Sequence, residues 1–217
     1  MSIRLAKHTV QRLVAEELRK EIICGNFRPG YPLRLRDLAD QYQVSTMPVR
    51  EALRQLESDG LVTIIPRRGA IVTKLSADEL EEIYDIRTTL EVMATRYAVP
   101  AISEETLETL DGLIVTMDQH LEEVTELVRL NFEFHSVLYA ASRRNHLLEL
   151  IQTLRHRTEH YLHAYIVGKE GMPMAQDEHR LVVAACRRGD AEQAAAIMQE
   201  HVTKAGNAIV EYLRQGE

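Results

Sequence analysis

Apolar residues in the first 60 positions recur at helical spacing in three short runs. Residues 10–23 carry one apolar stripe and are followed by Gly25, a common residue at helix ends. Residues 35–44 carry a second stripe and close with a tight turn at Gln43 and Val44. The pattern predicts two helices with buried faces formed by Val10, Leu13, Val14, Leu18, Ile22 and Ile23 in the first and by Leu35, Leu38, Ala39 and Tyr42 in the second.

Residues 45–60 predict a third helix with one polar and one apolar face. Ser45 is suited to the N-cap because its hydroxyl can accept from a free amide of the first turn, and Pro48 fits that turn because an amide there would have no partner. The predicted core residues are Val49, Ala52, Leu53 and Leu56. The side chains that then project outward from the amino-terminal half are those of Thr46, Met47 and Arg50.

Two short runs rich in β-branched residues follow at 61–65 and 70–74, on either side of the sequence PRRG. They predict a hairpin with a basic tip. Three short helices followed by a hairpin make a winged helix-turn-helix, which places its third helix in the major groove of DNA and its wing against the backbone or minor groove. Arg67 and Arg68 at the tip are suited to clamp phosphates, a contact that adds affinity without reading sequence.

From residue 76 the apolar spacing is helical throughout. The sequence SADE at 76–79 is a capping box that opens a helix reaching to about Val99, with predicted buried residues Leu80, Ile83, Tyr84, Leu90 and Met93. Further helices fit residues 103–120, 122–142, 144–167, 175–188 and 190–214. The predicted fold is therefore mainly α, with an N-terminal winged helix-turn-helix domain at 1–75 and an all-α helical bundle of about six helices at 76–217.

The charge of the chain is divided unevenly between these two parts. A net charge of −7 argues against a nucleic-acid partner when taken whole, but residues 1–75 hold thirteen Lys+Arg against eight Asp+Glu. The head therefore carries +5 and the rest −12. A basic head joined to an acidic body favours a nucleic-acid-binding module.

Composition also bears on membrane and metal chemistry. No apolar stretch approaches the roughly 20 residues that span a bilayer, and the first residues lack the apolar core of a signal peptide. We therefore expect a cytoplasmic protein without a membrane partner. Cys24 and Cys186 are far apart and lack metal-type spacing, which favours two buried thiols.

Histidines form two candidate metal sites in the helical part. One is compact: His156, His160 and His163 lie on one helical face at a spacing that can chelate a metal, in a segment of exposed character. The other is scattered along the chain and consists of Asn131, His135, His179 and His201. Periodicity does not establish that the scattered residues meet in space, so the residues by themselves leave both sites open.

Three sequences stand out in the first 70 residues: GNFRPGYPLRLRDLA, VSTMPVREALRQLESDGLV and PRRGAIV. With them, this part of the chain resembles the DNA-binding head of the GntR-type bacterial transcription regulators. The resemblance implies DNA contacts at Arg36, Ser45, Thr46, Met47, Arg50 and Gly69. Arginine can bond guanine O6 and N7 together, whereas Thr46, which stands where the family usually has an arginine, offers one hydroxyl and a methyl. This substitution means that the usual operator sequence of the family does not transfer directly.

Two sequences of the helical part are NFEFHSVLYAASRRNHLLELI and EHRLVVAACRRGDAEQAAAIMQEHV. They resemble the FadR/VanR-like branch of the same family, whose effector domain is the FCD domain. It implies a divalent metal ion, zinc, nickel or manganese, at positions that many members fill with one Asp and three His. These positions are Asn131, His135, His179 and His201. Asn131 is the departure, since an amide oxygen is a weaker ligand than a carboxylate and either binds directly, acts through water, or leaves a three-histidine site.

The expected effector of such a site is a small carboxylate. Three neutral imidazoles leave the metal's positive charge uncompensated, which favours an anionic ligand. Arg87, in the sequence YDIRTTLE, matches a recurrent arginine of the branch and is a candidate for binding the same anion. The alternative for Arg87 is a helix-surface ion pair with Glu91 at i+4.

Together these features predict a ligand-responsive transcription regulator, a repressor that binds an imperfect palindromic operator in double-stranded DNA as a homodimer. One alternative is a metal-dependent helical-bundle enzyme. No H-E-x-x-H, P-loop, nucleophile elbow or dinucleotide fingerprint occurs in the sequence, and no glutamate has a histidine three residues later, as di-iron bundles require. The other alternative is a nonspecific DNA-binding protein.

Overall fold

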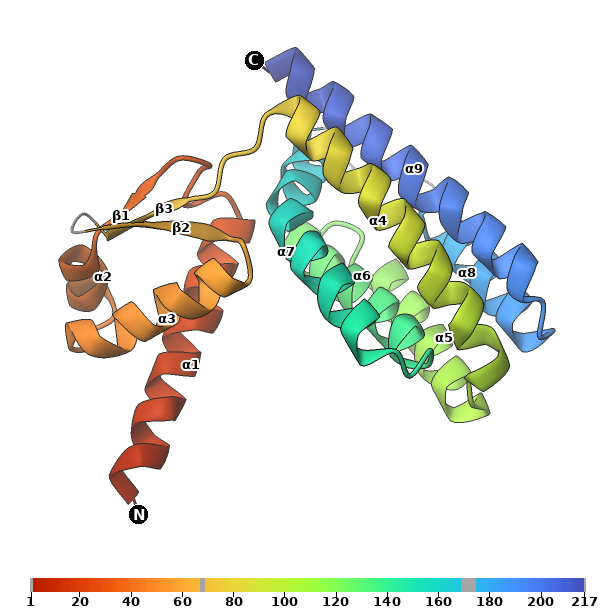
Figure 1. The fold of residues 1–217 in the computed structure, drawn as a ribbon, viewed down its shortest axis with the longest axis horizontal. Helices are drawn as coiled ribbons and strands as arrows, with labels where there is room; N and C mark the ends of the chain where they lie inside the picture. The colour runs from red at the N-terminus through yellow and green to blue at the C-terminus, as the bar shows by residue number, and fades with distance from the viewer. Residues whose placement is uncertain (1, 67–68, 169–174, 217) are drawn as a thin grey trace. The chain divides into compact units, whose positions relative to one another are not determined.

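The computed structural model describes residues 2–66, 69–168 and 175–216. The chain divides into two compact units, Met1–Leu75 and Ser76–Glu217. The mainly α fold class is confirmed: a small helix-turn-helix unit with a short sheet precedes an all-helical unit (Figure 1).

The N-terminal unit contains three helices and a small antiparallel sheet. The helices are α1 (Ser2–Ile23), α2 (Leu35–Gln41) and α3 (Thr46–Ser58). The predicted hairpin is formed by β2 (Val62–Ile65) and β3 (Gly69–Val72). The sequence pattern did not predict β1 (Pro32–Leu33), which pairs with the outer edge of β3 and gives the strand order β1-β3-β2. Two residues are too few to display a strand period, which is why the pattern missed it.

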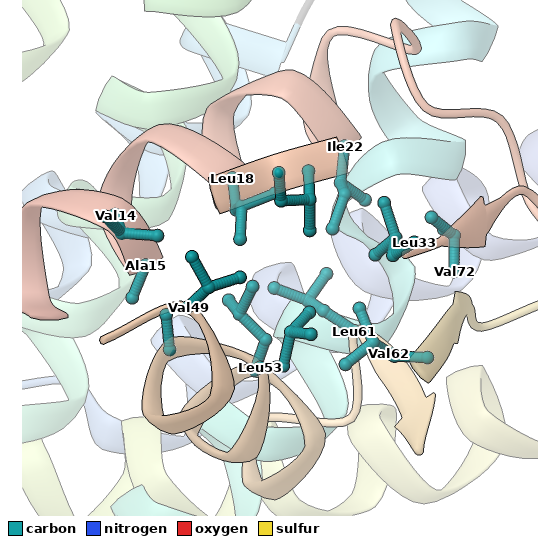
Figure 2. Packing of buried hydrophobic residues seen from close by; sticks show 14 of the residues in the cluster. Val14, Ala15, Leu18, Ile22, Leu33, Val49, Leu53, Leu61, Val62 and Val72 are labelled. Carbon is teal, nitrogen blue, oxygen red and sulfur yellow. The ribbon is translucent and has the colours of Figure 1, made fainter. Parts of the chain in front are cut away.

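The core of this unit lies between α1, α3 and the sheet (Figure 2). Leu18, Val49 and Leu53 are nearly inaccessible to solvent, as predicted. Leu13 was predicted to be buried but is 54% exposed. The buried stripe of α1 follows a repeat of four through Val14, Leu18 and Ile22, and Leu13 lies on its flank.

Local backbone geometry connects α2 to α3 tightly. Gln43 has a positive φ of 52°, consistent with the predicted turn. Ser45 occupies the N-cap position of α3, with extended dihedrals, but its side chain makes no capping hydrogen bond. The prediction of the position was therefore right and that of the bond wrong, so the Ser45 hydroxyl, which is exposed, is not committed to the cap.

The C-terminal unit is built from long helices. They are α4 (Ala77–Ala98), α5 (Glu104–Gln119), α6 (Val124–Ala140), α7 (Asn145–Gly168), α8 (Ala175–Arg187) and α9 (Ala191–Gly216), with a 3-10 turn at Val99–Ala101. Ser76 and Glu79 form the predicted capping box at the start of α4. The predicted helices agree with these bounds to within a few residues.

Helix α4 organises the packing of this unit. It runs alongside α9 and also contacts α6 and α7 (Figure 1). Gly206 makes the close approach of α9 possible, because a Cβ there would lie 2.7 Å from the ring of Tyr84. Met93, predicted to be buried, is 41% exposed, and Leu90 is half-buried. Met93 lies off the buried face of α4, which runs through Tyr84, Arg87 and Glu91 and so includes charged side chains that the apolar pattern does not count.

None of the helices in the part of the chain that the structure describes has both the length and the apolar composition required to cross a bilayer.

Candidate functional site

The predicted DNA-reading residues lie on the surface of the N-terminal unit. Thr46, Met47 and Arg50 are exposed along the first turns of α3, and Arg36 is exposed in the first turn of α2. Met47 is 52% exposed, which is unusual for a methionine in a helix with a buried opposite face. These side chains are available to an external partner.

A groove of about 790 Å³ lies between α2, α3 and the hairpin. Arg36, Arg50 and Gly69 line it, so the structure brings together three of the predicted residues. Arg34 and Arg54 also line the groove and were missed by sequence reasoning. Neither residue has a distinctive spacing; only the groove indicates them. Four guanidinium groups around one depression, with Asp37 beside them, make a surface suited to a polyanion.

Gly69 has a structural reason to be glycine besides any contact with DNA. Its φ is +104°, and a Cβ would lie 2.5 Å from the carbonyl oxygen of Leu33 on β1. Arg67 and Arg68, the predicted phosphate clamps, lie outside the described residues.

In the C-terminal unit, three of the predicted metal ligands converge. His135 comes from α6, His179 from α8 and His201 from α9, and one ligand atom from each lies within 4.8 Å of the others. All three side chains are buried. Histidines at this separation can share one divalent ion.

Hydrogen bonds fix the protonation of two of these rings. His135 Nδ1 lies 2.9 Å from the Tyr139 hydroxyl, which itself donates to a carboxylate oxygen of Glu91. His201 Nδ1 lies 2.8 Å from Glu178 Oε2. Because both partners accept, each Nδ1 carries the proton, and Nε2 of each ring is left with a lone pair for a metal.

His179 provides the test of whether a metal fits. Both of its ring nitrogens are buried and have no hydrogen-bond partner. Burial lowers the pKa of His179 and of His135 well below the ordinary value of 6.5, with the neighbouring His201 and Arg155 contributing in the same direction. Both rings are therefore neutral near pH 7, as metal ligation requires. An ion between the three rings would give His179 the partner that it lacks.

Asn131, the fourth predicted ligand, lies one helical turn before His135 and lines a cavity together with His135 and His201. Its backbone carbonyl accepts from Arg155 Nη2 at 3.4 Å. The contribution of its side chain to metal binding stays a prediction.

This cavity, of about 30 Å³, is bordered by α4, α6, α7 and α9. His135 and His201 line it together with Arg87 and Arg155. Arg155 is a residue that sequence reasoning missed, because one arginine in a helix with several others gives no signal. The cavity thus places two cationic side chains beside two of the clustered histidines.

Arg87 is committed to partners inside the protein. Its Nε donates to Glu91 Oε1 at 2.8 Å and its Nη1 to Thr158 Oγ1 at 2.9 Å. The i+4 ion pair considered for Arg87 is therefore present, but it is buried and not on the helix surface, since Glu91 is 0% exposed. Burial alone would raise the pKa of Glu91, but Arg87, Arg155 and the Tyr139 hydroxyl together hold it below its usual value.

The compact histidine cluster on α7 behaves differently. His160 and His163 are buried, so the expectation of exposed character was wrong. Within the described residues, the group of side chains close enough to hold a metal contains none of the three. His163 Nε2 lies 3.3 Å from Thr125 Oγ1, and His156 stacks on Phe132. Successive turns of one helix did not make these rings converge.

Two family models match the chain, one in each of its two units. The model of the bacterial regulatory proteins of the gntR family matches residues 10–72, and the FCD domain model matches residues 82–204. An uncharacterized HTH-type transcriptional regulator of Bacillus subtilis, YdhC, is 31% identical over 91% of this chain and 88% of its own length. The HTH-type transcriptional repressor GlaR of Escherichia coli is 27% identical over 85% of this chain and 89% of its own length.

A solved structure shares the fold of nearly the whole chain. The structure of McbR/YncC of E. coli matches with a TM-score of 0.81 and 26% identity, over 95% of this chain and 98% of that one. Two family models, a relative above 30% identity and this structural match indicate a regulator and not an enzyme. The chain therefore belongs to the GntR family of bacterial transcription regulators and carries a GntR-type DNA-binding head and an FCD domain.

Proposed function

We propose that this protein is a metal-dependent repressor that releases or tightens its hold on an operator when a small carboxylate binds in the helical unit. The observation that carries the proposal is the buried His135, His179 and His201 cluster, in which His179 has no partner, beside a cavity lined by two arginines. The name of one relative, the repressor GlaR, supports repression. Such a regulator acts in the cytoplasm, where bacterial DNA is located.

The proposed metal ligands are the Nε2 atoms of His135 and His201 and one nitrogen of His179. Imidazole suits zinc and nickel, and manganese is a further candidate. Asn131 is proposed as a fourth, weak ligand, either direct or through water. The ion would supply a positive charge at the edge of the cavity, which three neutral imidazoles do not offset.

The proposed effector is a small organic acid. The carboxylate would face the metal and the two arginines that line the cavity, Arg87 and Arg155. At about 30 Å³ the cavity holds one or two water molecules, whereas a cavity that accepts benzene measures roughly 150 Å³. The effector therefore has only a few heavy atoms, or the cavity walls move when it binds, and such movement is a means of signalling.

In the N-terminal unit we assign two roles to the exposed side chains. Arg50, Thr46 and Met47 on α3, with Arg36, are proposed to read base edges, and the hydroxyl of Ser45 is proposed to contact the same groove. Arg67 and Arg68 are proposed as phosphate clamps beside Gly69.

These roles separate in binding measurements with cognate and random DNA. Arg50→Ala should cost roughly 1–3 kcal/mol on the cognate site and relax base preference, while Arg67→Ala should weaken all DNA evenly. Thr46→Arg should shift preference towards a guanine in each half-site. Equal losses on both DNAs for both alanine variants would refute the assignment.

We also propose a homodimer, because one winged head offers too few base contacts and two-fold symmetry doubles them. The exposed apolar stripe on α4 supports it: Ile86, Met93 and Tyr97 are 43%, 41% and 42% exposed and lie seven and four residues apart. Sedimentation should give a dimer for the wild type and a monomer for Met93→Asp. A monomeric wild type at micromolar concentration would contradict the proposal.

One experiment tests the function as a whole. DNA from upstream of the protein's own gene is titrated with the metal-free protein, the zinc-loaded protein, and the zinc-loaded protein with a panel of small carboxylates at constant ionic strength. We expect preference over random DNA, and a change in affinity with at least one acid only when metal is present. Equal affinity for both DNAs would make the protein a nonspecific binder, and an acid response without metal would remove the metal from the mechanism.

A further inference from the structure

The two arginines of the cavity differ in how well their hydrogen bonds are satisfied. Arg87 makes side-chain bonds of 2.8 and 2.9 Å, and its guanidinium lies 4.5 Å from the centre of the Tyr84 ring. These contacts hold it against Glu91 and Thr158. The Arg87 guanidinium therefore already has hydrogen-bond partners within the protein.

Arg155 is equally buried but poorly bonded. Its Nη1 lies 3.3 Å from Glu91 Oε2 and its Nη2 lies 3.4 Å from the Asn131 carbonyl, both near the limit for a hydrogen bond. Its Nε is buried and has no partner. A charged donor left unpaired inside a protein is costly, so the native state needs a reason to retain it.

The carboxylates around Arg155 leave its Nε without an acceptor. Arg87 and Arg155 share the carboxylate of Glu91, and Glu159, one turn beyond Arg155 on α7, adds a second carboxylate to the cavity lining. The unpaired Nε of Arg155, and not a net positive charge, is therefore what favours an added acceptor there. The Arg155 guanidinium also lies over the ring of Phe132 on α6, 5.2 Å from the ring centre.

We propose that Arg155, more than Arg87, receives the carboxylate of the effector, through the edge formed by Nε and an Nη. A carboxylate in the cavity accepts both N–H groups side by side, the planar match that guanidinium offers and ammonium does not. Arg87 then acts as a positioning residue that holds Glu91, and through it Arg155, in place. This assignment rests on the proposed function, because it assumes that the cavity binds a carboxylate.

The test uses the zinc-loaded full chain and acetate as the probe, titrated calorimetrically in chloride buffer of constant ionic strength. Arg155→Lys keeps the charge and removes the planar fork, and should weaken acetate binding by about tenfold to a hundredfold. The matched control is Arg157→Lys, on the same helix, half-buried and outside the cavity lining, which should stay within about twofold of the wild type. Zinc affinity, measured separately by chelator competition, should be unchanged in both.

The outcomes separate the two levels of the proposal. If acetate binds the wild type and Arg155→Lys equally, or if Arg87→Lys weakens acetate more than Arg155→Lys while remaining folded, the assignment is overturned and the carboxylate site stands. If acetate does not bind the zinc-loaded wild type, the carboxylate site fails and the assignment fails with it.

A second measurement covers the case in which Arg155→Lys does not fold. In the zinc-loaded wild type, acetate should shift the assigned Nε–H resonance of Arg155 more than that of Arg87. A larger shift at Arg87 would overturn the assignment.

Discussion

Two groups of histidines in the helical unit show how sequence spacing and spatial convergence differ. His156, His160 and His163 lie within eight residues of one helix, yet their rings do not gather in one place. His135, His179 and His201 come from three helices and lie with ligand atoms within 4.8 Å of each other. Side chains on one helix face point outward along parallel directions, whereas helices packed around a common axis can direct side chains to one point.

The groups also differ in how their nitrogens are used. In the scattered group, Tyr139 and Glu178 each accept from the Nδ1 of one ring, which leaves Nε2 of that ring with a lone pair. In the compact group, both nitrogens of His160 are buried without a partner, and His160 belongs to no group of three ligands close enough to hold a metal among the residues described. The first arrangement suits a ligand. In the second, an unpaired imidazole costs stability.

His160 therefore provides the largest expected effect, and it is a dependence on pH. Burial lowers the pKa of His160 from 6.5 to about 4. Below pH 6.5 the unfolded chain takes up a proton that the folded chain refuses, so stability falls as the pH drops from 6.5 to 4, by on the order of 3 kcal/mol from this residue. In urea unfolding of the metal-free protein, the free energy of unfolding should fall less between pH 6.5 and pH 4 for His160→Leu than for the wild type.

The comparison contains its own control. His135, His179 and His201 are present in both proteins, so their contribution to the pH dependence of stability cancels in the difference. Parallel stability curves for wild type and His160→Leu between pH 6.5 and 4 would mean that His160 is not held neutral by burial.

A smaller effect is expected from the groups that orient the scattered histidines. Tyr139→Phe removes the acceptor of His135 Nδ1, and metal affinity should fall by about 10–100-fold, or roughly 1.4–2.7 kcal/mol. Tyr165→Phe, on α7 against Tyr212, is a matched loss of one hydroxyl away from the cluster and should have no effect on affinity. Competition with a chromogenic chelator measures both. Equal affinities for the two variants would remove Tyr139 from the metal site.

The smallest effect is expected at Asn131. Because an amide oxygen is a weak, neutral ligand, Asn131→Ala should weaken zinc binding by less than about tenfold, while Asn131→Asp should strengthen it. The same competition assay applies. A loss in Asn131→Ala as large as that of a histidine variant would make the amide a full ligand, and an unchanged affinity in Asn131→Asp would place the side chain away from the ion.

The contrast between the two groups also marks what sequence can predict here. The helix bounds of the C-terminal unit, the capping box at Ser76 and the core stripe of α3 follow from local spacing and were predicted, whereas α1 begins eight residues before the predicted start. Local spacing favoured neither histidine group, and only the family resemblance pointed to the scattered one. Arg155 and the groove residue Arg34 were missed, because their significance depends on what other helices bring beside them.

Buried polar residues explain a further failure. From α4, Glu91 and Arg87 face the interior of the helical unit, where the hydrophobic pattern predicts apolar side chains, and Met93 faces outward. Glu91 pairs with Arg87 along α4, at the i+4 spacing that the sequence shows, and with Arg155 on α7, a contact that no period along α4 records.

The measurement that tests the central claim most directly is a set of calorimetric melts of chelator-stripped protein with and without zinc. For the wild type, zinc should restore stability by about 2.7 kcal/mol at a hundredfold excess over the dissociation constant. His179→Ala should abolish this recovery and His160→Ala should retain it. Recovery that survives in His179→Ala and disappears in His160→Ala would contradict the account and make the compact cluster the metal site.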